Sequence, residues 1–303
     1  MMSALVIAAV VLALVAMTPL VGRAQRARVE RRVAARLPLS ASGMIVGAEP
    51  LALEHRGATV GVVILHGFGD TPQTVDSLAR ALHAQGMEGS VPLLPGHGRT
   101  LPAFARSTRA QWLGAARDAY HAMRARHERV VLIGLSLGGA LATILAADES
   151  SLASLVLLAP YLDAPWWLRA LTHVAPAIAV VLPYVGGNSL RSIHDPVARA
   201  NALAYNAMPP ALVRDLVRAA DDARAALARV TAPTLYIQSR EDNRITVAVA
   251  TRAFASITAQ PKRLELLTGC GHVLTVDYCR ERVAALVIEW LRGVTSGYDT
   301  GTA

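Results

Sequence analysis

Charged and aromatic side chains are both scarce in this chain of 303 residues. Asp, Glu, Lys and Arg make up 17% of the sequence, aromatic residues 5% and hydrophobic residues 53%. A low fraction of charged residues together with a high fraction of hydrophobic residues excludes a disordered chain. The basic residues after residue 50 are scattered and few aromatics accompany them, so nucleic acid is not an expected partner. We expect a globular protein with a sizeable core.

The chain has only two cysteines, Cys270 and Cys279. No CxxC pair and no His/Cys cluster at ligand spacing accompanies them, so a zinc site is excluded. The other motifs imply neither a metal nor an organic cofactor. They are also too few for a disulfide scaffold. A single disulfide between them remains an alternative if the protein lies in an oxidising compartment, but we expect two reduced cysteines in the core.

The first 22 residues carry no charged side chain, a run about as long as the roughly 20 residues that a membrane-spanning helix needs. Six arginines and one glutamate follow between Arg23 and Arg36 and supply five of the eight net positive charges. A secretory signal normally has its positive charge before the apolar core, so a membrane anchor is favoured over a cleaved signal. The positive-inside rule then places the rest of the chain in the cytoplasm. Cleavage would instead mean export to the periplasm or outside the cell.

Short apolar runs of strand length alternate with helical patterns after a hairpin-like region at residues 44–55. Helical faces recur at 75–82, 112–123 and 283–291. Strands alternating with helices in this way predict a mostly parallel sheet covered by helices on both faces. The expected strands are residues 60–65, 89–94, 130–134, 154–159, 234–238 and 263–267.

The alternation stops between residues 161 and 231, where the sequence is helical, apolar and Pro-rich. Residues 170–190 are too broken by proline and glycine to span a membrane. A span there would also put the strands before and after it on opposite sides of the bilayer. We therefore expect a helical cap at 161–231, inserted into an α/β core of residues 43–160 and 232–296. The remaining parts are the anchor or signal sequence at 1–22, a basic linker at 23–42 and a flexible tail at 297–303.

The segment GLSLGG, residues 134–139, ends the strand at 130–134 and enters a helical pattern at 140–147. G-x-S-x-G between a strand and a helix is typical of a nucleophile elbow. The turn would force Ser136 into a strained backbone conformation, and a Cβ at Gly134 or Gly138 would collide across it. Ser136 is therefore the expected nucleophile.

A serine hydroxyl needs a histidine to take its proton and a carboxylate to orient that histidine. In this architecture the chain order is serine, acid, histidine. Asp242 or Glu241 follows the strand at 234–238, and His272 follows the strand at 263–267. Asp163, after the strand at 154–159, is the rival acid, but we interpret it as the start of the cap. We interpret Glu241 and Asp277 as solvated charges of a loop or helix start.

The oxyanion of such a reaction needs two backbone N–H donors. One is Leu137, directly after the nucleophile, and the other is Phe68 in LHGFGD, residues 65–70. His66 in that loop is interpreted as structural, because the chain order gives the base to His272. The segment PGHGRT, residues 95–100, lacks the spacing and ending of a phosphate loop and is expected to be a turn.

The motifs LHGFGD, PGHG, GLSLGG, QSRED and GCGHVLTVD follow one another in this order. With them, the chain from about residue 60 to 290 resembles the α/β-hydrolase superfamily. It is most similar to bacterial carboxylesterases and monoacylglycerol lipases, which are serine aminopeptidase S33-like hydrolases. The resemblance implies a serine hydrolase that cleaves carboxylic esters through an acyl-enzyme and has a helical cap between the sixth and seventh strands. It also implies Ser136, Asp242 and His272 as the catalytic residues and Phe68 and Leu137 as oxyanion donors.

Other activities of the superfamily stay open. Ser136 argues against dehalogenases and epoxide hydrolases, which carry Asp at the elbow. Enzymes of the superfamily that catalyse carbon-carbon hydrolysis, amide or peptide hydrolysis or acyl transfer also have serine at the elbow. A non-catalytic membrane-bound binding protein is a further alternative. The apolar cap, with Trp166 and Trp167 as expected substrate contacts, favours a small-molecule ester or lipid of medium-chain or monoacylglycerol type. Part of the cap could also touch a bilayer beside the anchor.

Overall fold

The computed structural model describes the backbone of residues 4–187 and 189–296. It describes their side chains except for residues 4–16, Ser189 and Ser296. The expected flexible tail at 297–303 lies outside the described residues.

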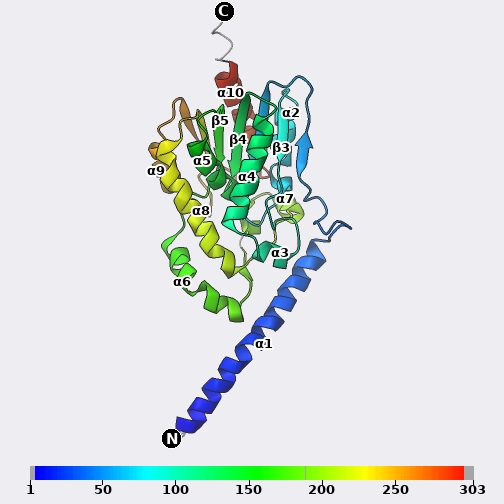
Figure 1. Cartoon of the computed structure of the whole chain (residues 1–303), viewed down its shortest axis with the longest axis vertical. Helices are drawn as coiled ribbons and strands as arrows, with labels where there is room; N and C mark the ends of the chain where they lie inside the picture. The colour runs from blue at the N-terminus through cyan, green and yellow to red at the C-terminus, as the bar shows by residue number, and fades with distance from the viewer. Residues whose placement is uncertain (1–3, 188, 297–303) are drawn as a thin grey trace, which may run out of the picture.

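A seven-stranded sheet in the order β1-β3-β2-β4-β5-β8-β9 forms the centre of the molecule (Figure 1). Its neighbouring strands are all parallel except β1 and β3. The six expected strands are present, and β3 ends three residues earlier than expected. The strands are β1 (Leu51–Leu53), β2 (Val60–Leu65), β3 (Glu88–Val91), β4 (Arg129–Leu135), β5 (Ser154–Leu158), β8 (Thr234–Ser239) and β9 (Lys262–Leu267).

Helices cover both faces of this sheet, because its central strands are apolar on both sides. Val63 of β2 packs with the core cluster on one face, and Val62 packs with the cluster on the other. The first face carries α4 (Arg109–Arg124), α5 (Leu137–Asp148), α8 (Val213–Ala226) and α9 (Val247–Ser256). The second carries α2 (Asp76–His83) and α10 (Arg280–Ser296) (Figure 1). The predicted α/β fold with a mostly parallel sheet is confirmed.

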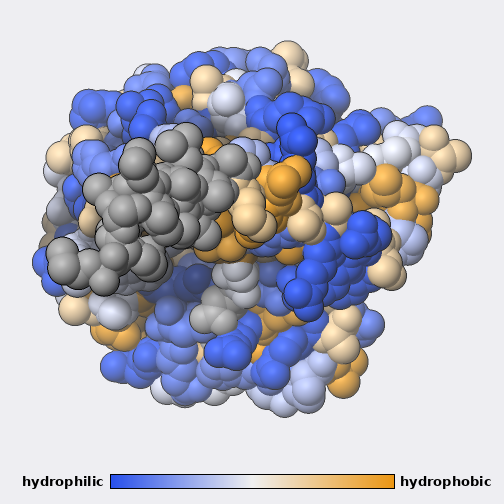
Figure 2. Space-filling view, turned by 90° about the horizontal axis from the view of Figure 1, so that it is seen from below, coloured by the Kyte–Doolittle hydropathy of each residue, from blue (hydrophilic) through white to orange (hydrophobic). Residues whose placement is uncertain are grey.

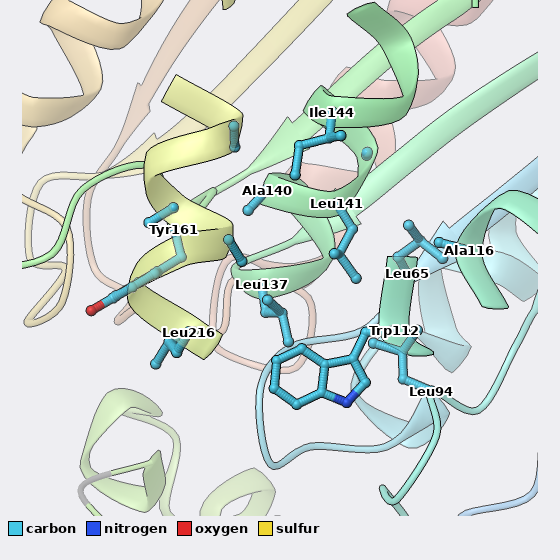
Figure 3. Close-up of a cluster of buried hydrophobic side chains, with 14 of the residues drawn as sticks. Leu65, Leu94, Trp112, Ala116, Leu137, Ala140, Leu141, Ile144, Tyr161 and Leu216 are labelled. Carbon is cyan, nitrogen blue, oxygen red and sulfur yellow. The ribbon is translucent and has the colours of Figure 1, made fainter. Parts of the chain in front are cut away.

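Trp112 of α4 is the largest fully buried side chain. Figure 3 shows its indole among Leu65, Leu94 and Leu137. Its ring Nε1–H donates to the carbonyl of Pro95 at 3.1 Å, so the one polar group of the side chain is satisfied. Trp112 therefore joins α4 to the loop after β3 and to the start of α5.

The cap leaves the sheet after β5 and returns at β8. In chain order it follows the fifth strand of the sheet, so the expected place between a sixth and a seventh strand is wrong. The reason is the N-terminal region, where residues 44–55 form the single strand β1 rather than a hairpin. Ile45 forms only an isolated antiparallel bridge, with Leu39, and its N–H donates to the Gly98 carbonyl. The cap contains α6 (Trp166–Val181), β6 (Val185–Gly186), α7 (Pro196–Asn201), β7 (Ala207–Met208) and α8.

Short elements complete the chain between these parts. One α-helix, α3 (Leu101–Ala105), follows β3, and β6 pairs with β7 in a separate two-stranded sheet. The 3-10 helices are η1 (Pro72–Thr74), η2 (Ser189–Ser192), η3 (Pro210–Leu212) and η4 (Leu227–Arg229).

Helix α1 (Ala4–Arg36) corrects the prediction for the N-terminus. Within residues 4–187 and 189–296, no helix is long and apolar enough to cross a membrane, so the expected N-terminal anchor is wrong. The apolar run is the first part of one helix that continues through Pro19 and the arginine-rich stretch. The prediction of a cytoplasmic location was based on the charges that follow an anchor, so it loses its basis.

The second half of α1 packs on the cap, although residues 23–36 were expected to lie in a linker. Arg36 donates to the carbonyl of Ala202 at 3.1 Å and to that of Ala204. Gln25 Nε2 donates to the Tyr184 carbonyl at 2.5 Å, and the Tyr184 hydroxyl donates to Glu30 Oε1 at 2.7 Å. These contacts join α1 to two separate segments of the cap.

Exposed apolar side chains gather on the face of the molecule that carries α1 and α6 (Figure 2). The cap and α1 therefore both carry apolar side chains that do not pack on the core. The exposed side chains are Met17, Leu20, Val21, Trp166, Trp167, Val174, Val180 and Leu182.

Cys270 and Cys279 form a disulfide, with their Cα atoms 5.8 Å apart. The expectation of two reduced cysteines is therefore wrong. Both side chains are buried, as expected, because the loop between them folds back and brings its ends together in the core. Sequence spacing alone does not reveal this fold of the loop.

Replacing Trp112 by alanine should lower the free energy of unfolding by about 3–5 kcal/mol, because it opens a cavity in a filled core. Trp166 is 79% exposed, so Trp166→Ala removes the same side chain without a cavity and should change stability by no more than about 0.5 kcal/mol. Urea unfolding followed by circular dichroism measures both. Equal losses would contradict the packing described above.

Candidate active site

Ser136 lies in the turn between β4 and α5 with φ 53° and ψ −115°. A positive φ is strained for a residue with a side chain, and here the surrounding backbone imposes it. A Cβ on Gly134 would overlap the backbone of Gly138, and a Cβ on Gly138 would overlap the carbonyl of Leu65. The two glycines therefore allow the close approach of β4 and α5 that holds the serine at the carboxyl end of β4.

The structure brings Ser136, His272 and Asp242 into one hydrogen-bonded line. His272 Nε2 lies 2.8 Å from Ser136 Oγ, and its Nδ1 lies 2.7 Å from Asp242 Oδ2. Because an ionised carboxylate only accepts, Nδ1–H is the donor to Asp242 and Nε2 is free to accept the serine proton. This geometry can activate a serine hydroxyl.

The Asp242 carboxylate is buried and has several donors. Gln238 Nε2 donates to its Oδ2 at 2.7 Å, and the N–H groups of Arg244 and Ile245 donate to Oδ1 at 2.7 and 3.0 Å. Burial alone would raise the pKa of Asp242. The charge and hydrogen bond of His272, together with the two backbone N–H groups, outweigh burial and lower the pKa. Asp242 therefore stays ionised against the imidazole.

The other carboxylates considered from the sequence have different partners. Asp163 pairs with Arg169 at 2.9 Å and with Arg224 at 2.8 Å, within the cap. Glu241 accepts from the Gly269 N–H at 2.7 Å. Of Asp163, Glu241 and Asp242, only Asp242 contacts His272.

The loop with the expected second oxyanion donor is fixed by His66. His66 Nε2 accepts from the Leu94 N–H at 3.1 Å, and Nδ1 lies 3.0 Å from the Gly67 carbonyl. Burial lowers the pKa of His66 to about 4, so the ring is neutral and can accept. The Phe68 ring packs on Trp112, with centroids 5.8 Å apart. The Leu137 N–H is at the start of α5, where a helix leaves its N–H groups unbonded.

Ser136 and His272 open into a cavity of about 350 Å³ beneath the cap. Of the two tryptophans expected to contact substrate, Trp167 lines this cavity and Trp166 does not. The apolar lining includes Phe68, Tyr161, Trp167, Leu168, Tyr205, Met208, Leu216 and Val273, and the polar lining includes Asp70, Ser192, Asn206, Asn243 and Arg244. Most of these residues come from the cap, whose path the sequence did not reveal. Among the described residues no group of three or more His, Cys, Asp or Glu could hold a metal.

Asp70 and Arg244 give the cavity a charged wall that the sequence did not predict. Asp70 is 7% exposed, and burial raises its pKa to about 6, with partial opposition from the charges of His272 and Arg244. A Cβ on Gly67 would lie 2.8 Å from Asp70 Oδ2 and 3.5 Å from Ser136 Cβ, so Gly67 leaves space between them. Arg244 Nε donates to Ser192 Oγ at 3.1 Å.

Asp277 was expected to be a solvated charge and is instead fully buried. Its carboxylate accepts four backbone N–H groups, one of them from Gly271 beside His272. The signal in the sequence was a single acidic residue at the end of the apolar run VLTV. A charge in such a run needs buried partners.

The model of the serine aminopeptidase, S33, family matches residues 57–278. The chain belongs to this family. The thermostable monoacylglycerol lipase of Bacillus sp. (strain H-257) is 27% identical over 253 residues, which cover 82% of this chain and 95% of that protein. The carboxylesterase of Bacillus subtilis (strain 168) is 24% identical over 252 residues, covering 80% and 96%.

A solved structure from work on LipS and LipT, two metagenome-derived lipolytic enzymes, is 28% identical with a TM-score of 0.73. It covers 82% of this chain and 98% of its own. The resemblance noted in the motifs is thus confirmed. These relatives support an enzyme of the carboxylic ester hydrolase class.

Asp70→Asn should stabilise the folded chain at pH 8. The folded-state pKa of Asp70 lies above its unfolded value of about 3.9, so ionisation between about pH 4 and 6 costs folded-state stability. The gain from the substitution should grow through this window and reach at most about 3 kcal/mol above it. Urea unfolding of both proteins at pH 5, 6 and 8 measures it.

Asp76→Asn is the matched control, because Asp76 pairs with Arg80 at the surface and should change stability by no more than about 0.5 kcal/mol. An Asp70→Asn protein less stable than the wild type at pH 8 would show that the Asp70 charge is stabilised where it lies.

Proposed function

We propose that this protein is a serine hydrolase that cleaves carboxylic esters of medium-chain or monoacylglycerol type through an acyl-enzyme. The observation that carries the proposal is the Ser136–His272–Asp242 hydrogen-bonded line, which opens into a partly apolar cavity. The names of the relatives, a monoacylglycerol lipase and a carboxylesterase, support the substrate class.

In the proposed reaction His272 Nε2 takes the proton of Ser136 as its Oγ attacks the ester carbonyl carbon. The negative oxygen of the tetrahedral intermediate accepts from the N–H groups of Phe68 and Leu137. Asp242 stabilises the imidazolium. His272 then gives the proton to the alcohol oxygen as the ester C–O bond breaks, which leaves an acyl group on Ser136.

Water completes the cycle by the same route. His272 accepts a proton from a water molecule as it attacks the acyl carbon. The proton returns to Ser136 Oγ when the acid leaves. The same groups therefore act as base and as acid in both halves of the reaction.

The acyl chain has a place among the apolar side chains of the cap and the core. Trp167, Leu168 and Leu216 line the cavity that Ser136 opens into. A short polar ester would leave this surface in contact with water. Longer acyl chains bury it, so we expect them to be preferred.

Ser136→Ala and His272→Ala should each lower kcat by about 10⁴-fold or more, and Asp242→Asn somewhat less. A fluorophosphonate probe should label the wild type and the Ser42→Ala control but not Ser136→Ala, since Ser42 is an exposed serine. Ester hydrolysis and in-gel labelling measure these changes. A greater loss in Asp163→Asn than in Asp242→Asn would overturn the choice of acid.

The value of kcat/KM should rise with acyl length from two to eight carbons. Each buried methylene contributes up to about 0.8 kcal/mol, close to a fourfold gain per carbon. Trp167→Ala should flatten this series, whereas Trp166→Ala should leave it unchanged because Trp166 is outside the cavity. A wild-type series that is flat or falling would reject an acyl site in this cavity.

A further inference from the structure

Asp277 is a buried carboxylate on the loop that carries His272. Its Oδ2 accepts the N–H groups of Gly271 and His194, both at 2.7 Å. Its Oδ1 accepts those of Asp195 and Tyr278, both at 2.9 Å. None of the ion pairs within the described part of the chain includes Asp277, so backbone dipoles alone compensate its charge.

The four bonds keep this carboxylate charged. Burial alone would raise the pKa of Asp277, and the bonds from His194, Gly271, Asp195 and Tyr278 outweigh burial and lower it. Hydrogen bonds to an ionised acceptor are roughly twice as strong as those between neutral groups. Asp277 therefore fixes the backbone groups that donate to it.

Two of these bonded segments meet at His272. Gly271 directly precedes the histidine, and its N–H is held by Asp277. On the other side, the Val273 N–H donates to the Ser192 carbonyl of the cap at 3.2 Å. A Cβ on Gly271 would overlap that same carbonyl, which shows how closely the two segments approach.

The cap segment at 192–195 is tied to the same carboxylate. His194 and Asp195 donate their N–H groups to Asp277, so one side chain bridges the cap and the catalytic loop. The disulfide between Cys270 and Cys279 closes the loop that holds both His272 and Asp277. Movement of the loop is therefore restrained at its base and at Asp277.

We propose that Asp277 is a positioning residue that holds the imidazole of His272 in line with Ser136 and ties this alignment to the cap segment 192–195. The proposal rests on the proposed function for its kinetic consequence. The distances of 2.8 and 2.7 Å around His272 leave little tolerance. A displacement of about 1 Å at a reacting group can cost about 100-fold in rate.

The test compares Asp277→Asn with Asp195→Asn. An asparagine at 277 loses the charge, and its NH₂ group faces backbone N–H donors. Asp195→Asn removes a negative charge from the same neighbourhood, but asparagine caps α7 as well as aspartate does. The backbone N–H of residue 195 remains available to Asp277.

Two esters with the same acyl chain, a glyceryl ester and a p-nitrophenyl ester, provide the kinetic readout. The alkoxide of the first needs a proton from His272 on leaving, whereas nitrophenolate departs as an anion. Asp277→Asn should lower kcat for the glyceryl ester by about 10–100-fold with KM changed less than about threefold. In kcat/KM, which reports acylation, the loss for the p-nitrophenyl ester should be clearly smaller, and Asp195→Asn should resemble the wild type.

Rates are normalised to the sites labelled by a fluorophosphonate, which removes the effect of misfolded enzyme. Equal losses in kcat/KM on the two esters after this correction, or an equal loss in Asp195→Asn, would overturn the proposal. Where Asp277→Asn does not fold, Asp277→Glu takes its place, because it keeps the charge and displaces the carboxylate by one methylene. Wild-type kinetics in Asp277→Glu would then reject the role.

A readout without turnover separates this inference from the proposed function. We expect the Nδ1–H proton between His272 and Asp242, whose bond is 2.7 Å long, to give a far-downfield proton NMR signal. It should be shifted or lost in Asp277→Asn and retained in Asp195→Asn. A wild type that hydrolyses neither ester would reject the proposed function, while an unchanged signal in Asp277→Asn would reject the positioning role.

Discussion

The strained turn at Ser136 is the constraint on which the site depends. It exists because β4 is held in the middle of the sheet between β2 and β5, and α5 must start directly at its end. The cost of the positive φ is met by packing, since α5 is buried along nearly its whole length. The serine then projects toward the loops after β8 and β9. Because these strands are parallel to β4, their loops bring Asp242 and His272 to the carboxyl end of the sheet, where the serine lies.

The cap is held over this edge by contacts of unequal strength. Asp163, Arg169 and Arg224 form partly exposed ion pairs within it, and such pairs contribute little. The bonds to Asp277 are less accessible to water because its side chain is fully buried, and the carbonyl bonds from Arg36 of α1 add a further attachment of the cap. Helix α1 lies outside residues 57–278, which match the family model, and its bonds to the cap support the cap from a separate part of the chain.

The sequence predicted those parts in which local pattern and structure coincide. The strands and flanking helices follow from apolar runs, and the turn at Ser136 follows from glycines at positions where a Cβ would collide. Pairings across the chain that no motif marks were missed, because nothing local encodes them. The bridge between Cys270 and Cys279, the docking of α1 and the burial of Asp277 all depend on how separate segments meet. The apolar N-terminal run was misinterpreted for the same reason, since nothing local shows that its helix continues through residues 23–36 and contacts the cap.

Three buried aspartates in and around the site show how backbone donors decide the state of a carboxylate. Asp242 and Asp277 each accept two or more backbone N–H groups, and the pKa of each is lowered in spite of burial. Asp70 has no hydrogen bond to its carboxylate among the described residues, and burial raises its pKa. One residue type therefore provides two fixed negative charges behind His272 and one group in the cavity that titrates near pH 6. The pKa values differ because turns of the backbone direct N–H groups at the carboxylates of Asp242 and Asp277, whereas the loop at Asp70 directs none at its carboxylate.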